Sequence, residues 1–145
     1  GSNISWTGRS LHADTVSGEL IGGNISLIYS LIGTPADPDT KGKILFIEEV
    51  GEYLYRLDRM LLSLKLAGKF KGLKALLVGG FRDIGETAKP WQKTTYELIK
   101  DIVSEYHYPV FFNFPAGHIE DNRSFYSGKT ARIDVEGRKF FLSYP

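Results

Sequence analysis

Two kinds of apolar pattern alternate along this chain. Short continuous apolar runs at residues 44–47, 75–78 and 110–112 are typical of β-strands that are covered on both faces, as in a parallel sheet. Residues 17–21 give a fourth strand signal. Between the strands, apolar residues recur at helical spacing over 25–32, 53–67 and 91–106. The alternation predicts an α/β fold whose mostly parallel sheet is joined by right-handed crossover helices.

Residues that favour helix ends stand at the limits of these segments. Asn24 is a good N-cap for the first predicted helix, and Gly33 and Gly68 are good stops for the first two. Pro90 fits the first turn of the third. The spacing of leucines makes the helix over 53–67 the strongest prediction of the three.

The end of the chain has a different pattern. Over residues 130–135, Ala131, Ile133 and Val135 alternate with charged residues, and an apolar stretch resumes at 140–143 after the turn signal Glu136-Gly137. This predicts a C-terminal antiparallel hairpin. Residues 1–16 are polar and without clear period, so we interpret them as a lead-in, in which Gly1-Ser2 resembles the scar left by removal of a tag. Residues 17–145 then form one domain.

Composition narrows the function classes. A net charge of +1 gives no electrostatic signature for nucleic acid or an anionic membrane. No apolar run approaches the length of a membrane span, and no leader pattern indicates secretion. With no cysteine, disulfides, thiolate catalysis and cysteine-ligated metals are excluded. The three histidines show no metal-ligand spacing, so we expect neither a metal nor a cofactor.

Candidate chemistry follows the predicted strands. In an open parallel sheet, ligands bind beyond the carboxyl ends of the strands. Glu48 and Glu49 follow the run at 44–47, and residues 113–118, which end in His118, follow the run at 110–112. Glu48 and His118 should therefore meet at one rim of the sheet, where a carboxylate can orient an imidazole as in a hydrolytic triad.

Plainer interpretations stand beside this hypothesis. Either acid could be a solvated strand end or the first turn of the next helix, and His118 could be a turn residue. His12 and His107 are interpreted as structural or incidental. The run of residues 22–24, Gly-Gly-Asn, could be a tight turn with a cap; no dinucleotide or P-loop motif is present.

A nucleophile is not evident. No G-x-S-x-G elbow occurs, and Ser26, which follows the Gly-Gly-Asn run, is expected on a first helical turn. A base and its orienter without a nucleophile suggest half of an active site.

Five short motifs occur in order and resemble a known family. They are Gly-Glu-Leu-Ile-Gly-Gly-Asn at 18–24, Leu-Ile-Gly-Thr-Pro at 31–35, Gly-Lys-Ile-Leu-Phe-Ile-Glu-Glu-Val-Gly-Glu at 42–52, Tyr-Arg-Leu-Asp-Arg-Met-Leu at 55–61 and Phe-Pro-Ala-Gly-His at 114–118. Together they resemble the C-terminal domain of LD-carboxypeptidases, a family of serine peptidases. The resemblance runs from about residue 17 to the end of the chain.

The resemblance implies a swivelling β/β/α domain in a two-domain, cytoplasmic bacterial enzyme. Such an enzyme releases the terminal D-alanine of murein tetrapeptides in cell-wall recycling and needs no metal. Its Ser-Glu-His triad is divided: the glutamate and histidine correspond to Glu48 and His118, and the serine lies in an N-terminal domain that this chain does not contain. The isolated chain is then expected to be inactive. The family is often homodimeric, but no pattern in this sequence indicates an interface.

Two alternatives stay open. The microcin C self-immunity hydrolases, which cleave aminoacyl-nucleotides, share the architecture, and Trp6 or Trp91 could stack on a base or simply pack. A non-catalytic binding module is the other alternative, and it predicts that Glu48 and His118 lie apart. The sequence does not identify substrate-binding residues.

Overall fold

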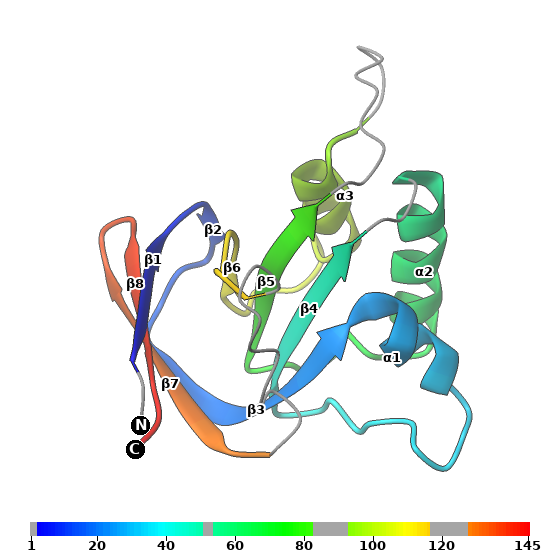
Figure 1. Cartoon of the computed structure of the whole chain (residues 1–145), viewed down its shortest axis with the longest axis horizontal. Helices are drawn as coiled ribbons and strands as arrows, with labels where there is room; N and C mark the ends of the chain where they lie inside the picture. The colour runs from blue at the N-terminus through cyan, green and yellow to red at the C-terminus, as the bar shows by residue number, and fades with distance from the viewer. Residues whose placement is uncertain (1–2, 51–53, 83–92, 117–127) are drawn as a thin grey trace.

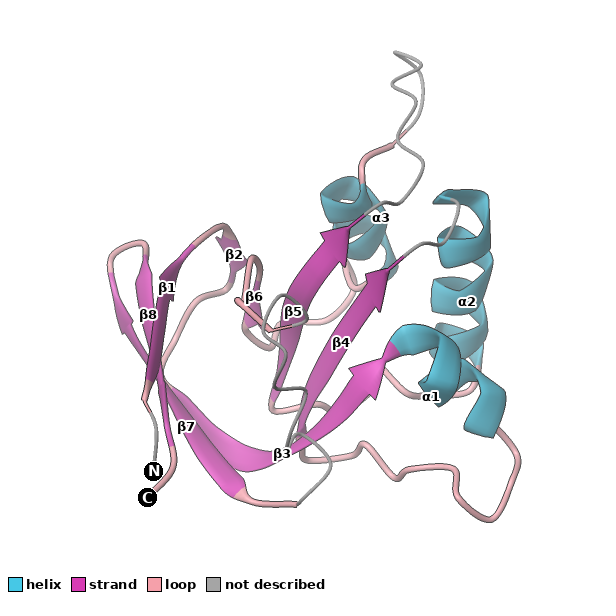
Figure 2. Ribbon diagram, viewed as in Figure 1, coloured by secondary structure: helices cyan, strands magenta, loops and turns pink. Residues whose placement is uncertain are grey.

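The fold is an α/β structure built on a curled, mixed sheet (Figures 1 and 2). The computed structural model describes residues 3–50, 54–82, 93–116 and 128–145. Within them, eight strands form a sheet in the order β1-β8-β7-β3-β4-β5-β6-β2, accompanied by three helices. The strands are β1 (Ile4–Thr7), β2 (Ser10–Leu11), β3 (Val16–Asn24), β4 (Ile44–Val50), β5 (Ala75–Arg82), β6 (Val110–Phe111), β7 (Thr130–Glu136) and β8 (Lys139–Ser143). The helices are α1 (Ile25–Leu31), α2 (Leu54–Leu66) and α3 (Thr95–Ile102).

The predicted parallel core and C-terminal hairpin are confirmed. Strands β3, β4, β5 and β6 pair in parallel, and a described helix lies between each successive pair along the chain. Strands β7 and β8 form the antiparallel hairpin. Strand β3 links the two parts, because its first half pairs antiparallel with β7 and its second half pairs parallel with β4.

Two apolar cores lie on opposite faces of the parallel strands. On one face, alternate residues such as Leu45 and Ile47 of β4 pack with the three helices. On the other face, Ile44 and Phe46 pack with the antiparallel strands, which the curl of the sheet brings over them. Strands that are covered on both faces consist of continuous apolar runs, so β4 and β5 could be predicted from the sequence.

The lead-in is part of the sheet, which corrects the expectation that it lacks regular structure. Strand β1 pairs with β8, and β2 pairs with β6. Trp6 is buried, and its indole N–H donates to the Phe112 carbonyl at 3.0 Å. Trp6 also packs edge-on against Phe114. Of the two interpretations of Trp6, packing is therefore the one that the structure supports; Trp91 lies outside the described residues.

Helix α3 is shorter than predicted. It begins at Thr95 rather than residue 91, because Thr94 and Glu97 form a reciprocal capping box, and it ends at Ile102 rather than residue 106. The predicted first turn at Pro90 lies outside the described residues. His107 stands beyond the helix, and its ring contacts His12 with 5.5 Å between ring centroids.

Strand β3 does not end at residue 21, as predicted, but continues to Asn24. Gly22 has a φ of 122°, and a Cβ at this position would lie 1.9 Å from the Phe46 carbonyl oxygen of β4. Gly22 therefore allows a close approach of two strands, and the glycine pair is not a tight turn.

We expect Gly22→Ala to lower the free energy of unfolding of the chain by about 3 kcal/mol or more, because the methyl group meets both a positive φ and backbone of β4. Gly33→Ala is the matched control, since Gly33 also has a positive φ but a Cβ there would meet no atom within 4 Å. It should lose only about 1–2 kcal/mol. Denaturant unfolding measures both, and equal losses would contradict the role assigned to the close approach.

Candidate functional site

The side chain of Asn24 connects the end of β3 with the end of β4. Asn24 is the N-cap of α1, and its Oδ1 accepts the Leu27 N–H at 3.2 Å. In the strand register Asn24 stands opposite Glu48, and the Asn24 side chain lowers the pKa of the Glu48 carboxyl. Because the amide oxygen is used by the helix cap, the amide nitrogen is the group available to face the Glu48 carboxylate.

Glu48 is a buried carboxylate at the rim of the parallel sheet, and the residue is only 6% exposed. Burial raises the pKa of Glu48 above its ordinary value; the Asn24 hydrogen bond opposes this rise, and the charge of Glu49 adds to it. The interpretation of Glu48 as a solvated strand end is therefore wrong. A poorly hydrated carboxylate of this kind interacts strongly with any cationic donor that reaches it.

Glu49 is also buried, but on the other face of β4. It is 1% exposed, and its Oε1 accepts a hydrogen bond from the Ser26 hydroxyl of α1. That hydroxyl also lies 3.6 Å from the Met60 sulfur of α2. Glu49 Oε2 has no hydrogen-bond partner among the described residues. Glu49 thus faces the helices, and it too is not the solvated strand end that the sequence left open.

A β-bulge lies beside Glu48. Ile47 pairs with Val78 and Glu49 pairs with Phe81, so one residue of β4, Glu48, stands against two residues of β5, Gly79 and Gly80. A Cβ at Gly79 would lie 2.7 Å from the ring of Phe46 and 3.2 Å from the Ala116 carbonyl oxygen. The absence of a side chain at Gly79 therefore leaves room beside Phe46 for the chain that follows β6.

The segment that follows β6 runs toward the face of β4 that carries Glu48. The Phe114 N–H donates to the Val78 carbonyl at 3.0 Å, and the Phe114 ring packs edge-on against Phe46. Ala116 is buried in the same cluster as Phe46. Since side chains alternate along a strand, Phe46 and Glu48 share a face of β4. The described chain thus approaches this face, and His118 lies outside the described residues.

The described residues offer few other groups for catalysis or metal binding. None of the serines there hydrogen-bonds a histidine, and Ser26 is bonded to Glu49 instead. No group of three or more His, Asp or Glu side chains among the described residues could hold a metal ion. None of the described helices has the length and apolarity needed to cross a membrane.

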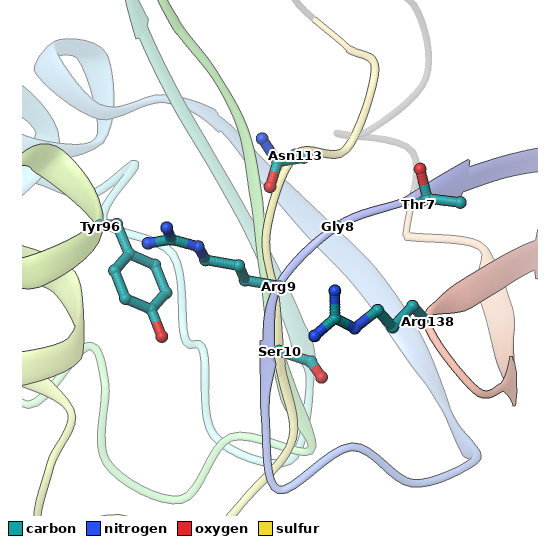
Figure 3. A pocket seen from close by; sticks show the side chains of 7 residues that line it. All are labelled: Thr7, Gly8, Arg9, Ser10, Tyr96, Asn113 and Arg138. Atoms are coloured by element: carbon teal, nitrogen blue, oxygen red, sulfur yellow. The ribbon is translucent and has the colours of Figure 1, made fainter.

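A second concave surface, which we call the arginine pocket, was not visible in the sequence. It is a cavity of about 800 Å³. Figure 3 shows its lining, in which Arg9 lies against Tyr96 and Arg138 extends toward the segment of residues 7–10. The pocket combines residues from the lead-in, α3, the segment after β6 and the turn of the C-terminal hairpin: Thr7, Gly8, Arg9, Ser10, Tyr96, Asn113 and Arg138. Nothing in their spacing along the chain indicates a common site.

Comparison with known proteins identifies relatives. Residues 17–133 match the family profile described as the LD-carboxypeptidase C-terminal domain. The probable murein peptide carboxypeptidase of Bacillus subtilis is 38% identical over 101 residues, which are 70% of this chain and 32% of that protein.

Solved structures agree in fold. The muramoyltetrapeptide carboxypeptidase of Oxalobacter formigenes superposes with a TM-score of 0.84 and 31% identity, covering 99% of this chain and 50% of that one. The microcin C7 self-immunity protein MccF has a TM-score of 0.70 at 21% identity, covering 92% of this chain and 40% of its own. The likeness to MccF shows the fold alone. The chain spans half or less of the proteins it matches here.

We expect two substitutions to move the pKa of Glu48 in opposite directions. Asn24→Asp keeps a helix cap but replaces the amide donor with a negative charge, so the pKa should rise further. Glu49→Gln removes a neighbouring negative charge, so the pKa should fall. Carboxyl-carbon NMR titration measures both. Shifts in the same direction, or none, would contradict the electrostatic description of this rim.

We expect Glu48→Gln to stabilise the chain at neutral pH. Because the folded-state pKa of Glu48 is raised, the wild type loses unfolding free energy as pH rises from the ordinary glutamate range through the folded-state pKa. Glu48→Gln does not lose unfolding free energy in this way. Its Tm should therefore exceed that of the wild type over this pH range and at pH 7. Glu136→Gln, at an exposed glutamate, is the control and should show no such pH-dependent gain. A Glu48→Gln protein less stable than wild type at pH 7 would oppose this.

Proposed function

The chain belongs to the LD-carboxypeptidase family as its C-terminal domain, and on this premise we propose that it supplies the Glu48 and His118 pair of a serine-type enzyme that removes the terminal D-alanine from murein tetrapeptides. The observation that carries the proposal is the buried Glu48 carboxylate, which lies at the rim of the parallel sheet. The chain that leads to His118 passes over the same face of β4.

In the proposed mechanism, His118 accepts the proton of the attacking serine and later passes it to the leaving D-amino acid. Glu48 accepts a hydrogen bond from the other ring N–H, holds the imidazole in one tautomer and stabilises the imidazolium that forms. Burial of Glu48 supports this role, because a carboxylate in a poorly hydrated site stabilises a neighbouring cation more than an exposed one does. Asn24 would act as a positioning residue through its hydrogen bond to Glu48.

We propose that the serine and the oxyanion hole come from an N-terminal domain of a longer polypeptide. Two observations support this: the chain covers 50% of the Oxalobacter formigenes enzyme, and the matched profile is that of a C-terminal domain. Action on murein peptides, a role in cell-wall recycling, a cytoplasmic location and independence of metals and cofactors belong to the same proposal. They rest on the family and on the names of the relatives.

A substrate of the MccF type is the alternative within the hydrolases. The fold likeness to MccF supports a shared scaffold and does not by itself favour an aminoacyl-nucleotide. The assay described next therefore includes an aminoacyl-nucleotide beside the murein tetrapeptide. Faster turnover of the nucleotide by the two-domain enzyme would favour the alternative.

We expect the lone chain to release D-alanine from a murein tetrapeptide only at background rate, and the enzyme that contains both domains to release it efficiently. In the two-domain enzyme, Glu48→Gln should lower kcat by roughly 10³–10⁴-fold, and His118→Ala by at least as much. His107→Ala is the matched control, because His107 lies beyond α3 against His12. Efficient hydrolysis by the lone chain, or near-normal turnover by His118→Ala, would refute the divided site.

We also expect Glu48→Gln to lower the pKa of His118, since the substitution removes the negative charge that stabilises the imidazolium. Proton NMR titration of His118 in the lone chain measures the change without a substrate. An unchanged His118 pKa would favour a non-catalytic module.

A further inference from the structure

Helix α1 is joined to β4 by a hydrogen bond on the helix-covered face of the sheet. The Ser26 hydroxyl, on the first turn of α1, donates to Glu49 Oε1. Glu49 is 1% exposed, and the Ser26 oxygen also lies 3.6 Å from the Met60 sulfur of α2. We call this hydrogen bond the Ser26–Glu49 link. The mechanism proposed above uses neither of its side chains.

A carboxylate is an unfavourable side chain at the position of Glu49. On the same face of β4, Leu45 and Ile47 belong to the apolar core. Glu49 Oε2 has no hydrogen-bond partner among the described residues, so Oε1 alone is paired there. A buried and incompletely paired carboxylate lowers stability relative to an apolar side chain of similar size. Core packing therefore does not account for Glu49.

Helix α1 depends on contacts with the rest of the fold to keep its place. It has seven residues, and isolated helices of this length are not stable in water. Ile25 and Ile28 anchor it in the apolar core, but apolar contacts are not directional. A hydrogen bond has a preferred distance and angle, so the Ser26–Glu49 link fixes the first turn of α1 relative to β4.

The residue that faces Glu48 directly precedes this turn. Asn24 is the N-cap of α1, and its Oδ1 accepts the Leu27 N–H. Asn24 also stands opposite Glu48 in the register of β3 and β4. The connection between β3 and α1 thus reaches Glu48 through Asn24 and Glu49 through Ser26. A shift of the first turn would move Asn24 away from Glu48.

We propose that Ser26 and Glu49 are positioning residues of the catalytic site, because their hydrogen bond holds the first turn of α1 and so keeps Asn24 against Glu48. This inference rests on the proposed function, which assigns Glu48 to the catalytic pair. Ser26 and Glu49 act through Asn24 and take no part in the chemical step.

NMR titration of the lone chain tests the link without any hydrolysis. In the wild type, the side-chain amide signals of Asn24 should follow the titration of Glu48, because the two groups face each other. In Ser26→Ala they should no longer follow it, and the pKa of Glu48 should rise because the lowering effect of Asn24 is lost. Alanine favours helix, so this variant should stay folded.

Substitutions on α1 supply the matched controls. Ser30→Ala removes an exposed hydroxyl that donates to the Leu27 carbonyl of the same helix at 2.7 Å, and it should leave the response of Asn24 unchanged. Ser26→Thr keeps the hydroxyl and should retain the response. Asn24 signals that still follow Glu48 in Ser26→Ala, or an equal loss in Ser30→Ala, would overturn the proposal.

Substitutions of Glu49 separate the hydrogen bond from the charge. Glu49→Gln removes the charge but keeps an acceptor for the Ser26 hydroxyl, so Asn24 should still respond to Glu48. Glu49→Leu removes the acceptor and should abolish the response. Loss of the response in Glu49→Gln as well would show that the charge acts rather than the link, and would contradict the inference.

Kinetics of the two-domain enzyme distinguish this inference from the proposed function. We expect Ser26→Ala and Glu49→Leu to lower kcat about tenfold, with KM within about twofold, and Ser26→Thr and Ser30→Ala to retain kcat. Absence of D-alanine release by the unmodified enzyme would refute the proposed function, whereas the NMR titration would still report on the link. A normal kcat in Ser26→Ala would overturn the inference alone.

Discussion

The site depends on the burial of two adjacent carboxylates at the end of an apolar strand. Glu48 and Glu49 follow a run of apolar residues and point to opposite faces of β4, where each lies against a polar residue of the β3–α1 connection. Asn24 lies opposite Glu48 and lowers its pKa, and the Ser26 hydroxyl donates to Glu49. Burying charge in this way is unfavourable unless partners are held in place, so the close approach of β3 to β4 is a condition of the site.

The curl of the sheet determines what surrounds these carboxylates. If the sheet were flat, the face that carries Phe46 would need a second layer of helices. Instead β1, β7 and β8 fold over it and bury the face with Trp6 and Phe140. The same curl brings the turn after β7 close to the lead-in and to the exit of β6. One geometrical feature thus buries the Glu48 face and also forms the arginine pocket.

The two sites have opposite electrostatic character. At Glu48 a negative charge is held with little solvation, which favours interaction with a protonated imidazole. In the arginine pocket two exposed positive charges stand without acidic partners among the described residues.

Local pattern was sufficient for the parallel strands, the helix over α2 and the C-terminal hairpin, since buried strands and alternating positions can be recognised from residue order. Strand β4, however, continues through Glu48 and Glu49 to Val50 instead of ending at residue 47. The short edge strands β1 and β2 were missed because two to four residues carry too little periodicity. The limits of α3 were missed because a capping box overrides apolar spacing. The curl of the sheet determines whether Glu48 is solvated or buried. It also determines which distant residues line a pocket with Arg9. Those properties arise from contacts between segments more than a hundred residues apart, such as Trp6 with Phe112, and no local pattern records them.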